Sequence, residues 1–171
     1  MLLDKAAIFA VISDQLRLLT QVAIAAANQA HETATHSETV ARSKYETFGL
    51  EAAYLAHGQA QRVADCKAAE GMFDALKIRD FTENDAIDYG AVVIVCDCEE
   101  RAQLLLIGPA AGGVRVKLPL SVAELPQELD ELMVITPSSP LGSALMGRYQ
   151  DDEVVIHICG EPKQYVVLWI G

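Results

Sequence analysis

The sequence predicts an α+β protein in which a long antiparallel α-helical hairpin, a coiled coil, precedes a small antiparallel β-sheet domain with one covering helix. Three observations predict this fold class. No proline or glycine occurs between residues 4 and 43, which allows a helix of roughly 40 residues, about 60 Å long. Short apolar runs separated by turn residues fill the C-terminal half. A capped helical segment stands before the last two of these runs.

The first helix carries a single apolar seam. A helix of this length needs a partner along it, because most helical stability comes from burying an apolar face. The predicted seam residues alternate at spacings of three and four, as in a coiled coil, and they are Ile12, Leu16, Leu19, Ala23, Ala26 and Ala30.

A second helix is predicted from about residue 50 to residue 76, after a tip near residues 44–50 in which Gly49 is a turn residue. Five alanines at four-residue spacing form a predicted ridge against the first helix: Ala52, Ala56, Ala60, Ala64 and Ala68. Apolar residues near the base are expected to pack on the second domain, namely Ile8, Phe9, Ile12, Met72, Phe73 and Leu76. The predicted divisions are a hairpin over 1–78, a polar linker over 79–88 and a second domain over 89–171.

The second domain is predicted as an antiparallel sheet, because short turns join its strands. The expected strands are 91–98, 101–107, 113–118, 133–136, 153–159 and 164–169. The segment 136–152 predicts a short helix over 140–146, with Ser139 as its N-cap, Pro140 as its first residue and Gly147 as a left-handed C-terminal cap. The leucine-rich, acidic region 120–132 is left open between loop and helix.

Composition limits the function classes. The formal net charge is −11, which argues against a protein that grips nucleic acid through its own phosphate-neutralising surface. No run approaches the roughly 20 consecutive apolar residues of a membrane span, and the N-terminus lacks the pattern of a signal peptide. A cytoplasmic protein with reduced cysteines is therefore expected.

The chain offers no self-contained catalytic constellation. His31 and His36 are five residues apart, so they diverge by about 140° on a helix and cannot share a metal as a four-residue pair does. Cys96, Cys98 and Cys159 could converge only if their strands were neighbours, and buried thiols are the expected alternative.

The segment 136–152 resembles part of a known family. The run Ser-Pro-Leu-Gly-Ser-Ala-Leu-Met-Gly, an acidic turn and two final strands are similar to the C-terminal domain of Gre-type transcription elongation factors. The predicted coiled coil extends this resemblance over the whole chain. It implies an FKBP-like second domain, but the scattered late aromatic residues disfavour a prolyl isomerase pocket: Tyr89, Tyr149, Tyr165 and Trp169.

The resemblance implies a docking surface and a working tip. The globular domain of Gre factors docks on RNA polymerase at the secondary channel, which assigns docking to Ser138, Ser139, Pro140 and Leu141. The coiled coil enters the channel, and two acids at its tip help hold a second Mg²⁺ for transcript hydrolysis by the polymerase itself. The residues at the tip of this chain are Tyr45, Glu46, Thr47, Phe48, Leu50 and Glu51.

The tip departs from the family pattern. When Tyr54 and Ala52 are matched to the family, the two acidic positions fall on Thr47 and Leu50, and neither supplies a carboxylate. Glu46 and Glu51 lie one residue to either side, so a local shift would restore Mg²⁺ ligands.

Three functions of different classes therefore remain open. The first is a Gre-like regulator that binds bacterial RNA polymerase and inserts its coiled coil without efficient transcript cleavage. The second is an active cleavage factor that uses Glu46 and Glu51, and the third is an unrelated protein-interaction module. None makes the chain itself an enzyme, and none needs a cofactor beyond Mg²⁺ shared with the polymerase. The chain is expected to contact DNA and RNA only through the polymerase, to avoid membranes and to be a monomer or weak dimer.

Overall fold

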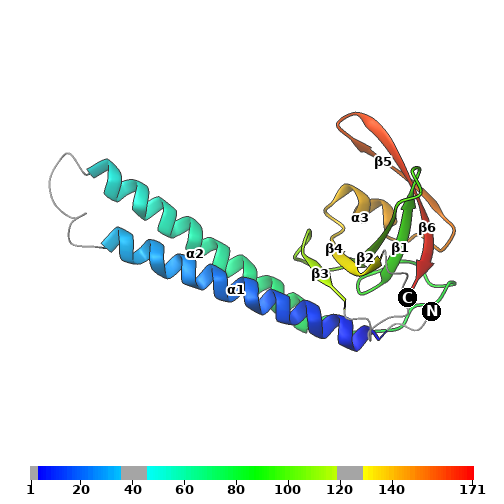
Figure 1. Cartoon of the computed structure of the whole chain (residues 1–171), viewed down its shortest axis with the longest axis horizontal. Helices are drawn as coiled ribbons and strands as arrows, with labels where there is room; N and C mark the ends of the chain where they lie inside the picture. The colour runs from blue at the N-terminus through cyan, green and yellow to red at the C-terminus, as the bar shows by residue number, and fades with distance from the viewer. Residues whose placement is uncertain (1–3, 36–45, 119–128) are drawn as a thin grey trace. The chain divides into compact units, whose positions relative to one another are not determined.

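The computed structural model describes residues 4–35, 46–118 and 129–171. It divides into two compact units, one formed by Asp14–Gly71 and the other by Met1–Ser13 together with Met72–Gly171. Two long helices precede a six-stranded sheet with one short helix (Figure 1). The predicted α+β fold class is therefore confirmed.

Helix α1 spans Lys5–Thr35 and begins where the Asp4 carboxylate accepts a hydrogen bond from the Ala7 amide at 3.0 Å. An acid at this position satisfies an amide that has no partner inside the helix. The predicted seam is confirmed, because all six of its residues are buried or half-buried: Ile12, Leu16, Leu19, Ala23, Ala26 and Ala30.

Helix α2 spans Glu46–Asp74, so Gly49 lies within the helix and not in a turn. The predicted alanine ridge is wrong, since Ala60, Ala64 and Ala68 are exposed. Residues four apart drift by about 40° per step around a helix, whereas a seam must alternate between three and four. The side chains that do follow the seam are Ala56, Gln59, Val63, Cys66, Glu70 and Phe73.

A polar contact joins the two helices within the seam. The buried Thr20 hydroxyl of α1 donates to the carboxylate of Glu70 on α2. Figure 1 shows the two helices side by side and running in opposite directions. Because they are antiparallel, residues 50 positions apart in the chain can meet in this contact. A polar pair in an otherwise apolar seam favours one register, because any slip leaves both groups without a partner.

By length and hydropathy, α1 passes a test for a membrane-spanning helix. An 18-residue window within its stretch Lys5–Thr33 has a mean hydropathy of 1.4, and among the described residues α1 is the one helix with such a window. Polar residues still interrupt every purely apolar run of α1, as the sequence predicts. A helix with one side packed in a hairpin passes the same test, and α1 packs its seam on α2.

The sheet contains all six predicted strands, with ends that differ by a few residues. They are β1 (Val92–Asp97), β2 (Ala102–Ile107), β3 (Arg115–Lys117), β4 (Glu131–Ile135), β5 (Glu153–Ile158) and β6 (Glu161–Ile170), and α3 (Pro140–Leu145) lies between β4 and β5. Their order across the sheet is β3-β4-β2-β1-β6-β5.

One pairing departs from the predicted antiparallel sheet. Strands β2 and β4 run parallel, with Leu104 opposite Leu132 and Ile107 opposite Ile135. Strand β3 intervenes in the chain and pairs with the outer side of β4, so the connection from β2 to β4 is long enough for the crossover that parallel neighbours need.

The central strands bury both faces of the sheet. One face forms a core with α3 in which Val93, Val95, Leu105 and Leu145 are fully buried. The alternate residues on the other face are buried as well: Val92, Ile94, Leu104, Leu106, Leu132 and Val134.

The base of the hairpin lies against the end of this second face. A Cβ atom at Gly108, just after β2, would lie 2.8 Å from Cζ of Phe73 and 2.7 Å from Cγ1 of Val134. Phe73 also meets Phe9, with ring centroids 6.4 Å apart. The expected packing of the base on the second domain is therefore confirmed for these residues, whereas Met72 is half exposed.

Lys5 ties the start of α1 to the segment after α2. Its Nζ donates to the Arg79 carbonyl at 2.6 Å and lies 4.4 Å from the Phe81 ring centroid, while the Arg79 guanidinium carbon lies 3.8 Å from that centroid. Burial lowers the pKa of Lys5 from 10.5 to about 8, opposed by the charge of Asp80 and assisted by that of Arg79.

We predict that Gly58→Ala and Gly71→Ala each stabilise the hairpin. Both glycines lie inside α2 with no atom within 4 Å of an added Cβ, so alanine restricts the unfolded chain without a clash. Urea unfolding followed by circular dichroism should show a gain of about 1 kcal/mol for each. A loss of stability in either variant would contradict the described position of these residues on open helix surface.

We also predict a pH-dependent contribution from Lys5. Between pH 8 and 10.5 the unfolded chain still holds a proton that folded Lys5 has released, so the free energy of unfolding rises with pH in this window. Lys5→Met should remove that rise. The measurement is the difference in unfolding free energy between the native chain and Lys5→Met from pH 7 to pH 10, and a constant difference would refute the burial of this amine.

Candidate protein-docking site

The predicted docking residues lie together at the start of α3. Ser139 is the N-cap of this helix, as predicted, and its Oγ accepts from the Gly142 amide at 3.1 Å. The same hydroxyl donates to the Thr136 carbonyl at 2.8 Å. The Ser139 amide also donates to that carbonyl, at 2.9 Å. Ser139 therefore fixes the turn and is not free to bind a partner through its hydroxyl.

Ser138 and Pro140 are the exposed members of the group. The Ser138 hydroxyl lies 2.7 Å from the Thr136 hydroxyl, and Pro140 occupies the first turn, where its missing amide proton costs nothing. Leu141 is half-buried against the core. The surface that this turn offers to a partner is thus a hydroxyl pair beside a rigid proline ring.

Two residues of this site were not singled out by the sequence. Thr136 supplies the carbonyl that receives both bonds from Ser139. Gly142 permits the turn, because a Cβ there would lie 2.1 Å from the Thr136 carbonyl oxygen. Their close approach depends on the path of the chain between β4 and α3, so no spacing in the sequence identifies them.

The other end of α3 is held by a neighbouring loop. Gly147 has φ +75°, as predicted for a left-handed cap. Its amide donates to the Ile87 carbonyl at 2.8 Å, and the Ile87 amide donates to the Arg148 carbonyl at 2.8 Å. These bonds join two loops that carry exposed aromatic side chains, Tyr89 at 42% and Tyr149 at 48% exposure. Exposed tyrosines are common at protein interfaces, and no pattern in the sequence places these two at one.

The predicted tip residues are only partly described. Tyr45 lies outside the described residues, as do the side chains of Glu46, Thr47, Phe48 and Leu50, although residues 46–50 are helical. Glu51 is exposed on α2. Thr47 and Leu50, at the positions that the family resemblance assigns to Mg²⁺-holding acids, do not fit a hard cation that needs carboxylate oxygens.

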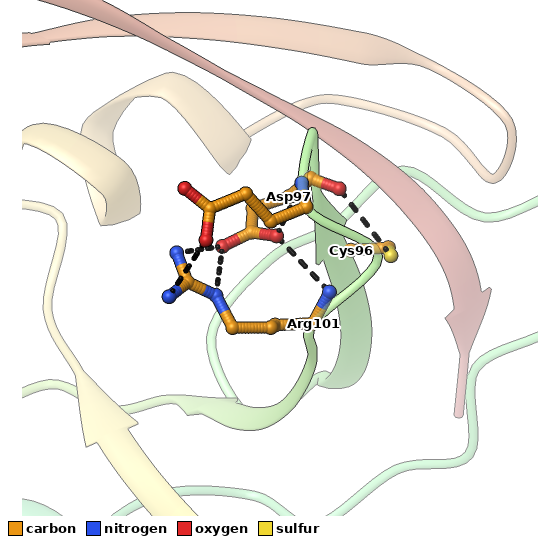
Figure 2. Close-up of polar contacts among 4 residues, drawn as sticks. Cys96, Asp97 and Arg101 are labelled. Carbon is orange, nitrogen blue, oxygen red and sulfur yellow. Dashed lines mark hydrogen bonds and ion pairs between the residues drawn. The ribbon is translucent and has the colours of Figure 1, made fainter.

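A further polar cluster of the second domain lies in the turn between β1 and β2 (Figure 2). The Asp97 carboxylate accepts from the Arg101 amide at 3.0 Å, from the Arg101 Nε at 2.9 Å and from the Glu99 amide at 2.9 Å. These contacts, the Arg101 amide above all, lower the pKa of Asp97. All partners belong to the same turn, so the cluster closes a hairpin and presents no open binding position.

Among the described residues the cysteines do not gather into a metal site. Cys96 lies on β1 and its Sγ contacts the Asp97 carbonyl at 3.5 Å, whereas Cys159 lies in the turn after β5. Strands β1 and β5 are separated by β6. Within the ranges that the structure describes, no group of three His, Cys, Asp or Glu side chains could hold a metal ion.

The fold and this surface define a helical hairpin followed by an α+β domain with an exposed Ser-Pro turn. Neither a protein-family model nor a curated protein matches the chain. Several solved structures resemble it at low similarity, and they include the following three. Gfh1 of Thermus aquaticus is 21% identical over 92% of both chains with a TM-score of 0.37. A structure described as the transcription factor Gfh1 is 14% identical over 92% of both chains, with a TM-score of 0.35.

The third is GreA factor homolog 1 (Gfh1) of Thermus thermophilus, which is 14% identical over 93% of this chain and 94% of its own, with a TM-score of 0.34. These identities and TM-scores are too low to assign a family. The fold of this chain is established by its own helices and strands.

We predict that Gly142→Ala destabilises the second domain. The added Cβ cannot coexist with the Thr136 carbonyl at 2.1 Å, and relieving the overlap costs about 1–3 kcal/mol. Ser139→Ala should cost about 1 kcal/mol by removing the cap. Ser143→Ala is the control, because Ser143 is exposed in the same helix, and its effect should stay within about 0.5 kcal/mol. Thermal unfolding of the three variants provides the measurement, and equal melting temperatures would rule out the described turn.

Proposed function

We propose that this protein is a Gre-like transcription elongation regulator. In this proposal it binds bacterial RNA polymerase at the secondary channel, inserts its helical hairpin and does not stimulate efficient transcript cleavage. The observation that carries the proposal is the Ser139–Pro140 turn, which caps a six-residue helix between β4 and β5 in the segment that resembles Gre factors.

Three features agree with this function. The exposed pair of Ser138 and Pro140 is a small, rigid surface suited to docking on another protein. The hairpin supplies two helices of 31 and 29 residues, each more than 40 Å long at about 1.5 Å per residue. The net charge of −11 suits a protein that reaches nucleic acid only through a partner.

The absence of efficient cleavage follows from the tip sequence. Thr47 and Leu50 occupy the two positions that are acidic in Gre factors, and neither can hold Mg²⁺ through a carboxylate. The chain therefore performs no reaction of its own and needs no cofactor in this proposal. It would act in the cytoplasm, where the polymerase works.

A cleavage factor is the second candidate, and one observation favours it. Glu51 is exposed on α2, one helical turn after Thr47, so a carboxylate is available near the predicted tip. In that case Glu46 and Glu51 would hold Mg²⁺ jointly with the polymerase.

We predict that core RNA polymerase retains this protein and that the docking turn is required. Ser138→Lys with Pro140→Ala should weaken capture by about tenfold, since interfaces depend on a few anchoring residues. Lys163→Ala is the control, because Lys163 is exposed on β6, away from α3 in the chain. Affinity is measured on immobilised polymerase at physiological salt. Failure of the native chain to bind would leave only the unrelated interaction module.

Cleavage is tested on backtracked elongation complexes. The expected result is no shortened transcript above the rate of polymerase alone. If the native chain shortens transcripts, and Glu46→Ala with Glu51→Ala abolishes this, the cleavage factor replaces the non-cleaving regulator.

A further inference from the structure

One side of the helical hairpin carries a groove that is open to solvent. The groove has a volume of about 300 Å³ and is lined by both helices: Ala26, Gln29, Ala30, Thr33, Leu55 and Gln59. We call it the hairpin groove. Its α1 wall is made mostly of small side chains, so a third backbone could approach closely there.

Exposed aliphatic side chains extend from the hairpin groove along the helices. Leu55 on α2 is 58% exposed, and Leu18 and Val22 on α1 are 52% and 57% exposed. Leu18, Val22, Ala25 and Gln29 follow spacings of four, three and four, which is the pattern of a helix-packing stripe. No charged residue occurs in α1 between residues 18 and 30. This helix therefore has a second packing stripe besides the seam that faces α2.

A polar atom in the hairpin groove lacks a donor. The Gln59 Oε1 atom is buried and accepts no hydrogen bond from any residue in the described parts of the chain. A buried acceptor without a partner is costly, so the two helices are held together less firmly at this level of the hairpin.

The rim of the hairpin groove is predominantly acidic. Glu51 lies one turn before Leu55, Glu32 lies three residues after Gln29, and both are exposed. On the other side of Gln59, α2 carries Arg62 and then Asp65. Asp65 accepts a hydrogen bond from Gln61 at 2.9 Å. Among the described residues beside the groove, three acids and one base favour an occupant with basic flanks.

We propose that the hairpin groove docks an amphipathic helix of a partner protein, with small or aliphatic residues on its buried face and lysine or arginine on its flanks. The inference deepens the proposed function by naming the chemistry of the surface that the hairpin meets. A second copy of this chain fits poorly, because its own groove would bring another acidic rim against the first.

The test uses the full chain and a synthetic probe, so its outcome is independent of polymerase capture. The probe is a fluorescein-labelled peptide of three heptad repeats composed of leucine, alanine and lysine. A control peptide carries glutamate in place of each lysine. Anisotropy at physiological salt should show micromolar binding of the basic peptide and at least tenfold weaker binding of the acidic one.

Matched variants separate docking from general charge attraction. The double variant Val22→Gln with Leu55→Gln keeps the net charge of the protein. Its affinity for the basic peptide should be lower by about tenfold or more. Val155→Gln is the control, because Val155 lies on β5 with a similar exposure of 54%, and it should bind as the native chain does. Equal affinity for all three proteins would overturn the proposal.

Sedimentation velocity tests the competing occupant. The native chain should remain monomeric at micromolar concentration. If the native chain instead forms a dimer, and Val22→Gln with Leu55→Gln dissociates it, the groove binds a second copy and the proposal is overturned.

Discussion

The structure depends on the need to cover both faces of one small sheet. Strands β1, β2 and β4 bury alternate residues on each side, as Val93 and Val92 illustrate on β1. A sheet with two apolar faces requires two covering layers. Helix α3 supplies one layer, and the base of the hairpin, through Phe73, reaches the end of the other face. The hairpin is thus anchored by the same burial that completes the sheet domain.

Because both faces of the sheet must be covered, the covering elements come very close to the rest of the domain at two glycines. Gly108 leaves room for Phe73 beside Val134, and Gly142 leaves room for the Thr136 carbonyl beneath α3. The two glycines serve opposite faces of the domain. Each marks a point where a covering element comes so near that a single methyl group would push it away, so neither cover tolerates ordinary substitution there.

The sequence predicts the elements well because their signals are local. The strands, the α1 seam and the Ser139–Pro140 cap each follow from spacing or from one residue's conformational preference. The α2 seam and the parallel pairing of β2 with β4 did not follow, for different reasons. Four-residue alanine spacing resembles a packing stripe, but only its partner helix shows that Ala56, Val63 and Cys66 face inward. Strand order is set by contacts far apart in the chain, as between Leu104 and Leu132. At the docking turn Ser139 could be predicted from its type, whereas the Gly142–Thr136 approach depends on a path that no spacing encodes.

The hairpin itself is held by little burial. Its seam includes three alanines on α1 (Ala23, Ala26 and Ala30) and two polar side chains on α2 (Gln59 and Glu70). The Thr20–Glu70 contact contributes more to register than to affinity between the helices. Several aliphatic residues lie outside the seam, on the outer surface of the hairpin, where Leu18, Val22 and Leu55 are exposed. Moving these side chains into the seam would give a more stable hairpin from the same residues. Their position on the surface is therefore unfavourable for folding alone, and it becomes favourable once a partner helix covers them.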